Sequence, residues 1–101
     1  MSRAAFMFEL LRDMTPVGLA DVLPSLLPQR CAEVIAVLSR NPTRLAQTLS
    51  RTSRFFLASQ LSNGSPDLIR EVWPQLDPTI RASAALHMDD LAFNDLQEML
   101  K

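Results

Sequence analysis

Apolar residues along this chain recur at the spacing of an α-helix, in runs of about a dozen residues, or roughly three helical turns and a tight connection. Each run opens with a signal for a helix start. Prolines that suit the first helical position follow Thr15, Leu27, Asn41, Ser65 and Asp77. Two further starts lack proline and are supplied by Ser53 and Asp89. The pattern therefore predicts a succession of short helices.

The boundaries of several helices follow from these signals. We expect the first helix over about residues 4–14, and the second to end at Pro24 after burying its apolar side chains, which are Leu19, Ala20, Val22 and Leu23. The fifth helix is expected over about residues 53–61, with Asn63-Gly64 as a terminator in the left-handed conformation.

Three of the runs share one motif, in which leucine and alanine are adjacent and a second leucine follows one turn later. The motif occurs at residues 19–23, 45–49 and 57–61. A lone helix of this length is marginal in water, so neighbouring units must stack and bury the motif between them. We therefore expect a single all-α domain over residues 1–101, built as a stack of about seven to eight short helices in a superhelical repeat arrangement.

The composition of the chain further restricts the class of protein and its expected location. The chain of 101 residues is 48% hydrophobic and 21% charged, as is usual for a soluble globular domain. The single cysteine, Cys31, cannot form an internal disulfide. Glu9, Arg12 and Asp13 interrupt the only early apolar run, so we expect neither a signal peptide nor membrane insertion, and a cytoplasmic location. The preference for arginine over lysine suggests a GC-rich bacterial source.

Helices opened by Leu-Asp-Pro or Leu-Pro, as in Leu76-Asp77-Pro78 and Leu27-Pro28, and followed by an Ala-x-x-Leu stripe, resemble those of a known family. They look like the cytosolic amino-terminal domain of the MgtE magnesium transporters. Flagellar motor switch protein FliG uses related short-helix repeats. The resemblance covers about residues 15–100 and implies a right-handed superhelix. The transporter domain is acidic and helps to sense magnesium. The resemblance therefore also implies an alternative function, a magnesium-responsive regulatory domain that would use the acidic C-terminal end of this chain.

Charge is unevenly distributed. No acidic residue lies between Glu33 and Asp67, and that window contains Arg40, Arg44, Arg51 and Arg54. These arginines predict a basic patch that meets a partner protein, which would increase the association rate more than the affinity. Weak nucleic-acid binding through the same residues is an alternative, although four arginines without interleaved tyrosine make a small footprint that disfavours it.

The end of the chain is acidic from Asp77 onward. Asp89, Asp90 and Asp95 could place oxygen atoms around a weakly held magnesium ion. Asp89 is better explained as a helix cap, so our main prediction is that these residues form no metal site.

Phenylalanines supply the second candidate surface. Phe55 and Phe56 are adjacent, so on a helix their side chains diverge by about 100° and one of them should face outward. In the first helix, apolar residues that include Phe6 and Phe8 occupy more than one face, which leaves apolar surface for a partner or for a second copy. The predicted partner-binding residues are Arg40, Arg44, Arg51, Arg54, Phe55, Phe56, Phe6 and Phe8.

Catalysis finds little support in the sequence. His87 has no cysteine or serine arrangement near it, and the only glycines, Gly18 and Gly64, form no phosphate-binding loop. Cys31 has only Arg30 beside it to lower its pKa, so we expect it in the core. The sequence therefore predicts a non-enzymatic protein-protein interaction, adaptor or regulatory module without a cofactor, whose partner is another protein or a second copy of itself.

Overall fold

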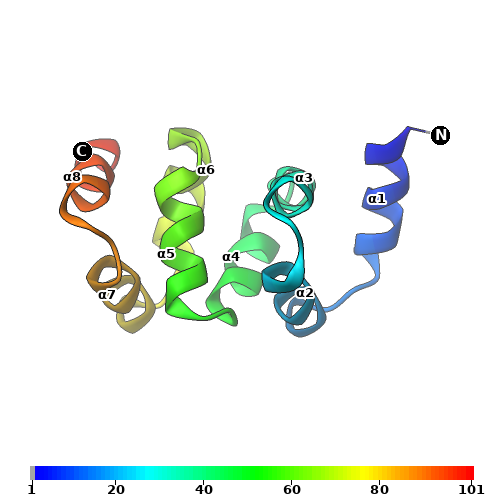
Figure 1. Ribbon diagram of the computed structural model, residues 1–101, viewed down its shortest axis with the longest axis horizontal. Coiled ribbons are helices and arrows are strands. Elements are labelled where there is room, and N and C mark those ends of the chain that lie inside the picture. Colours follow the sequence, from blue (N-terminus) through cyan, green and yellow to red (C-terminus); the bar gives the residue numbers. More distant parts are fainter. Residues whose placement is uncertain (1) are drawn as a thin grey trace.

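The polypeptide folds into short helices that follow one another in a row, with the two termini at opposite ends (Figure 1). The computed structural model describes residues 2–101, apart from the side chains of Ala4 and Phe8. In this range it contains eight α-helices, two short 3₁₀-helices and no strand. The helices are α1 (Arg3–Arg12), α2 (Pro16–Val22), η1 (Leu23–Ser25), α3 (Pro28–Leu38), α4 (Pro42–Ser50), α5 (Arg54–Asn63), α6 (Pro66–Val72), η2 (Trp73–Gln75), α7 (Pro78–Leu86) and α8 (Asp90–Met99). The predicted all-α stack of about eight short helices is confirmed.

Capping side chains fix where the helices begin, as the sequence predicts. Before seven of the eight described α-helices, the side chain of the preceding residue accepts a hydrogen bond from a backbone N–H of the first turn. These capping residues are Ser2, Thr15, Asn41, Ser53, Ser65, Asp77 and Asp89. Helix α3 follows Leu27, which has no capping oxygen, and begins instead with Pro28. A proline at this position removes no hydrogen bond from the helix, because the first N–H groups of a helix have no partner within the helix.

The Leu-Ala motif forms the core. Its nine leucine and alanine residues, in α2 with η1, α4 and α5, are all buried; they are Leu19, Ala20, Leu23, Leu45, Ala46, Leu49, Leu57, Ala58 and Leu61. Most helices pack on the helix two places further along the chain, as in the pairs α1–α3, α2–α4, α4–α6, α5–α7 and α6–α8. The helices therefore bury one another's apolar stripes, so each helix depends on its neighbours for stability.

The row contains a duplication that was not predicted. Pro16, Pro24 and Pro28 recur with the same spacing as Pro66, Pro74 and Pro78, and both triplets produce a seven-residue α-helix, a three-residue 3₁₀-helix and the start of the next α-helix. Helices α1 to α4 thus form a first unit, and helices α5 to α8 form a second unit. Aligning the proline spacings would have found this repeat from sequence.

Gly64 corrects the expected left-handed terminator. Its backbone is extended, with φ −77° and ψ 161°, so the glycine is not needed for its conformation. A Cβ at this position would lie 3.0 Å from the carbonyl oxygen of Gln60. Close approach of the chain to the end of α5 therefore explains the glycine.

Val22 corrects the expected burial of the second helix. Its side chain is 40% exposed, whereas the equivalent residue of the second unit, Val72, is fully buried. The reason is tertiary: among the described helices, α6 packs closely on two α-helices, α4 and α8, whereas α4 is the one α-helix closely packed on α2.

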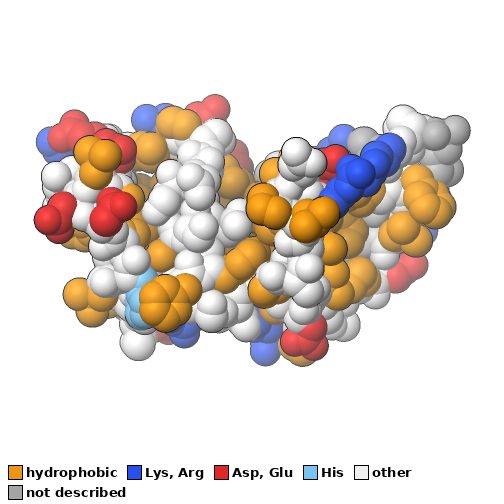
Figure 2. Space-filling view, viewed as in Figure 1, with side chains coloured by type: hydrophobic (Ala, Val, Ile, Leu, Met, Phe, Trp, Pro, Cys, Tyr) orange, Lys and Arg blue, Asp and Glu red, His pale blue; other side chains and the backbone are white. Residues whose placement is uncertain are grey.

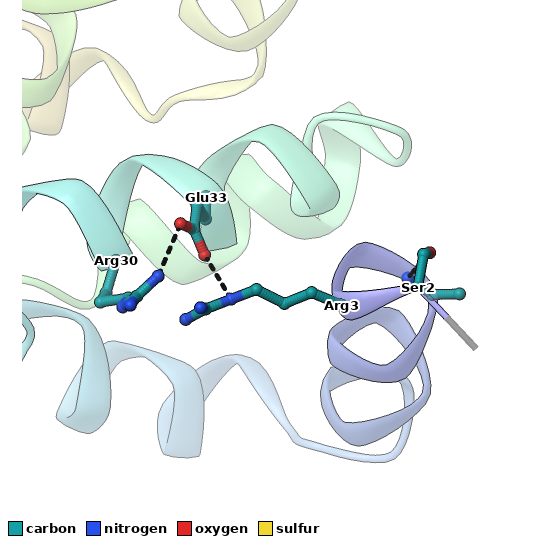
Figure 3. A network of polar contacts seen from close by, with 5 residues as sticks. Ser2, Arg3, Arg30 and Glu33 are labelled. Carbon is teal, nitrogen blue, oxygen red and sulfur yellow. Dashed lines mark hydrogen bonds and ion pairs between the residues drawn. The ribbon is translucent and has the colours of Figure 1, made fainter.

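An ion-pair network connects α1 to α3 on the surface (Figure 3). The Glu33 carboxylate is 3.1 Å from Nε of Arg3 and accepts a 2.8 Å hydrogen bond from Nη1 of Arg30. All three side chains are substantially exposed, so solvent screens these pairs and α1 depends mainly on other contacts.

Candidate functional site

A groove separates α3 from α5 (Figure 2). These two helices stand two places apart in the chain, yet among the described elements they are not one of the closely packed pairs. The space between them has a volume of about 740 Å³. Among the described helices, the groove is therefore the one position where a helix does not pack closely on the helix two places further along the chain.

Small side chains form much of the two walls. Helix α3 contributes Ala32 and Ala36 and is followed by Ser39, while α5 contributes Ser59 together with the larger Phe56. The groove is lined by Leu26, Pro28, Cys31, Ala32, Ile35, Ala36, Ser39, Phe56, Ser59, Gln60, Asn63, Gly64, Ser65 and Leu68. Small residues at a helix surface let another backbone approach closely. A backbone segment, and not only one side chain, can therefore reach the floor of the groove.

The groove lining contains no charged side chain. Some of its polar groups are satisfied within their own helices: the hydroxyl of Ser39 donates to the Ala36 carbonyl, and the amide of Asn63 donates to the Ser59 carbonyl. The surface therefore favours an apolar ligand face with few charges, because a charge placed there would lose hydration without gaining a counter-charge.

Cys31 lies in the wall of this groove and is buried. Burial raises the pKa of its thiol above the ordinary value, because the thiolate would lose hydration. The expected core position of Cys31 is confirmed, and its environment is that of an inert thiol.

We expect Cys31 to react with iodoacetamide at least about tenfold more slowly in the folded chain than in the unfolded chain at the same pH, because a smaller thiolate fraction and burial both slow the reaction. The raised pKa also means that its contribution to stability is present below the unfolded pKa and is lost as the pH rises through the folded pKa. Alkylation rates measured between about pH 7 and pH 10, with a guanidinium-unfolded control, test this. Equal rates in both states would contradict the buried thiol.

The four phenylalanines predicted to bind a partner have different environments. Phe55 is 74% exposed and its ring meets that of His87 edge-on, with centroids 4.6 Å apart. Phe56 is partly buried and lines the groove. The prediction that one of the adjacent pair faces outward is confirmed, and that residue is Phe55. Phe6 is exposed on α1, and the side chain of Phe8 lies outside the described residues.

Arg44 is engaged within the fold. Its guanidinium donates hydrogen bonds from Nη2 to the carbonyl oxygens of Leu11 and Met14, at the C-terminal end of α1. The side chain is partly buried. It therefore serves as a clamp between α1 and α4, a role that a sequence separation of 30 or more residues conceals.

The predicted arginines do not gather at one point. Arg40 and Arg44 lie near the N-terminal end of α4, whereas Arg51 follows its C-terminal end and Arg54 begins α5. The two pairs therefore lie toward opposite ends of a nine-residue helix that is about 13 Å long. Nη1 of Arg54 donates to the Ser50 carbonyl at 3.3 Å. Arg51 is exposed beside a hollow that also contains Asp77. None of the four lines the groove between α3 and α5.

The acidic residues at the end of the chain are exposed on α8. Asp89 caps this helix through a 2.8 Å hydrogen bond from the Ala92 N–H to Oδ1. Among the described side chains, no three histidine, cysteine, aspartate or glutamate residues come together in an arrangement that would hold a metal ion.

The chain matches no protein-family model, no curated protein and no solved structure. Its resemblance to the MgtE and FliG repeats therefore stays a prediction. Within residues 2–101, none of the helices combines the length and the apolar character that a membrane crossing requires.

Proposed function

We propose that this chain is a non-enzymatic interaction module that binds a short helical segment of a partner protein in the groove between α3 and α5. The observation that carries the proposal is the groove itself, an apolar opening in an otherwise regular row of packed helices. Amphipathic helices commonly bind in grooves of this kind, with apolar residues one turn apart as anchors.

The dimensions of the groove suit a helix. Its lining includes residues from the first turn to the last of both α3 and α5, from Pro28 to Ser39 and from Phe56 to Asn63. Helix α3 has 11 residues and is therefore about 16 Å long. A partner helix of about three turns would span this length, and the small residues Ala32, Ala36 and Ser59 would let it approach.

The chemistry of the lining selects the ligand. Because no charged side chain lines the groove, the docked face should be apolar and uncharged, with leucine, methionine or alanine at helical spacing. Phe56 is the aromatic anchor on the protein side. The arginines at the ends of α4 lie outside the groove and would contact only the flanks of such a partner.

A peptide selection tests this proposal. A displayed library of about three-turn helical peptides, with neutral, acidic and basic members, is selected on the wild-type chain. We expect enrichment of peptides with an uncharged apolar face, and we expect Ser59→Trp to weaken their binding at least about tenfold, because the indole fills the groove.

Ser62→Trp is the matched control, because Ser62 is also exposed on α5 but does not line the groove. It should leave peptide affinity within about twofold of wild type. Backbone amide shifts on peptide binding should cluster at Ala32, Ala36 and Gln60. Enrichment of acidic peptides that bind Ser59→Trp as well as wild type would reject the groove and support the arginines as the site.

A further inference from the structure

A second hollow lies beside α4. Its walls come from α4, from the first residue of α2, and from η2 with the start of α7. The hollow has a volume of about 640 Å³, which is in the range of ordinary ligand sites. It shares no lining residue with the groove between α3 and α5, so it is a separate candidate site.

The hollow contains one cation and one anion that are not paired with each other. Arg51, just after α4, and Asp77, just before α7, both line it and are both exposed. The ion pairs among the described side chains involve neither residue. Oδ1 of Asp77 accepts a 2.8 Å hydrogen bond from the Thr79 N–H, which leaves the second carboxylate oxygen for a ligand. A ligand with an anionic and a cationic group would therefore meet an opposite charge at each place.

Uncharged polar groups lie between these charges in the lining. Thr43 and Gln47 are one turn apart on α4, and within the described part of the chain their side chains form no hydrogen bond. From η2, Nε2 of Gln75 donates to the Glu71 carbonyl at 3.0 Å, and its amide oxygen remains an acceptor. A side-chain amide offers a donor and an acceptor, as a peptide unit does. The lining therefore suits the N–H and C=O groups of a peptide backbone.

The length of the hollow selects a peptide over a single amino acid. Thr43 and Arg51 are eight residues apart along α4, which corresponds to about 12 Å. An extended chain rises by about 3.3 Å per residue, so about four residues span this distance. The buried Ala46 and the partly buried Ile80 add an apolar surface for the stems of the ligand side chains.

We propose that the hollow beside α4 binds an extended peptide segment of about four residues that carries one acidic and one basic side chain. The guanidinium of Arg51 can bind the carboxylate through two parallel hydrogen bonds, and Asp77 binds the cation. Gln47 and Gln75 bind the backbone between them. This ligand differs from the apolar helix proposed for the groove, so the module would hold two different segments at once.

An array of capped pentapeptides tests the proposal. One glutamate and one lysine occupy every pair of positions in an alanine background, and matched peptides replace the glutamate by glutamine or the lysine by methionine. We expect the strongest binding from peptides with both charges. Arg51→Met should weaken the binding of such a peptide at least about threefold and leave its glutamine analogue unaffected, as measured by fluorescence anisotropy. Asp77→Asn keeps a capping oxygen for α7, and should act in the same way on the lysine alone.

Two variants outside the hollow are matched controls. Arg12→Met removes an exposed arginine, and Asp89→Asn changes the carboxylate that caps α8; both should leave peptide affinity within about twofold of wild type. Ser59→Trp closes only the groove between α3 and α5 and should also bind these peptides as wild type does. No binding at about 5 mM peptide, or an equal effect of Arg51→Met on the glutamate and glutamine peptides, would overturn the proposal. Binding of free amino acids without binding of capped peptides would overturn it too.

Discussion

Replacing Leu45 by alanine is expected to lower the free energy of unfolding by about 3–4 kcal/mol and the melting temperature by about 15–25 °C. Leu45 is fully buried in α4, the helix that packs on α2, α3 and α6 and joins the two units. Truncation leaves a cavity at a place where several helices meet, so the surroundings cannot collapse onto it. Thermal and urea unfolding, followed by circular dichroism, measure the effect.

Leu27→Ala is the matched control, because it removes the same atoms from an exposed position. Its effect should stay within about 0.5 kcal/mol. A loss of less than about 1 kcal/mol for Leu45→Ala would contradict the central role of α4, since it would mean that the two units are stable without this contact.

Replacing Arg44 by methionine is expected to lower the free energy of unfolding by about 1–3 kcal/mol and to loosen α1. The guanidinium donates to two carbonyl oxygens near the C-terminal end of α1, those of Leu11 and Met14, and hydrogen bonds from a charged donor are the stronger kind. The Leu11 carbonyl also accepts a hydrogen bond from the Met14 N–H, so loss of the guanidinium removes only part of its bonding. Methionine keeps the apolar stem but donates nothing. Amide hydrogen exchange should therefore accelerate in α1 more than in α5 or α6.

Two further variants separate the clamp from the charge. Arg44→Lys keeps the charge but lacks the planar fork, and should recover only part of the lost stability. Arg51→Met removes an exposed arginine at the other end of α4 and should change stability by less than about 0.5 kcal/mol. If Arg44→Met and Arg51→Met had equal effects, the hydrogen bonds to α1 would not be the cause.

Arg44 also shows why charge patterns in a sequence are weak predictors of a surface. The sequence has no acidic residue between Glu33 and Asp67, and four arginines occur in that interval. This pattern predicted a single basic patch. The fold separates them along α4 and turns one toward carbonyl groups of α1. A backbone carbonyl is an acceptor at every position of every chain, so no residue type in the sequence announces this partner.

The groove is a similar case. Its walls contain Ala32, Ala36 and Ser59. Nothing in the sequence distinguishes these residues from other small residues on short helices. Phe56 was a candidate from the sequence because adjacent phenylalanines cannot both enter one core layer. Which of them would line a cavity depended on the position of α3, and that position follows from contacts with α1 and α4.

By itself the sequence determined the starts of the helices, the all-α class and the buried Leu-Ala motif. These features depend on interactions within a turn or so of helix: the side chains of Ser53 and Asp89 each cap an N–H group three residues away, and leucines four residues apart share one face. Only the tertiary structure decided the opening between α3 and α5, the clamp by Arg44 and the exposure of Val22. Each of those is set by which helix lies beside which, and identical local patterns, as in α2 and α6, acquire different surroundings at the end and in the middle of the row.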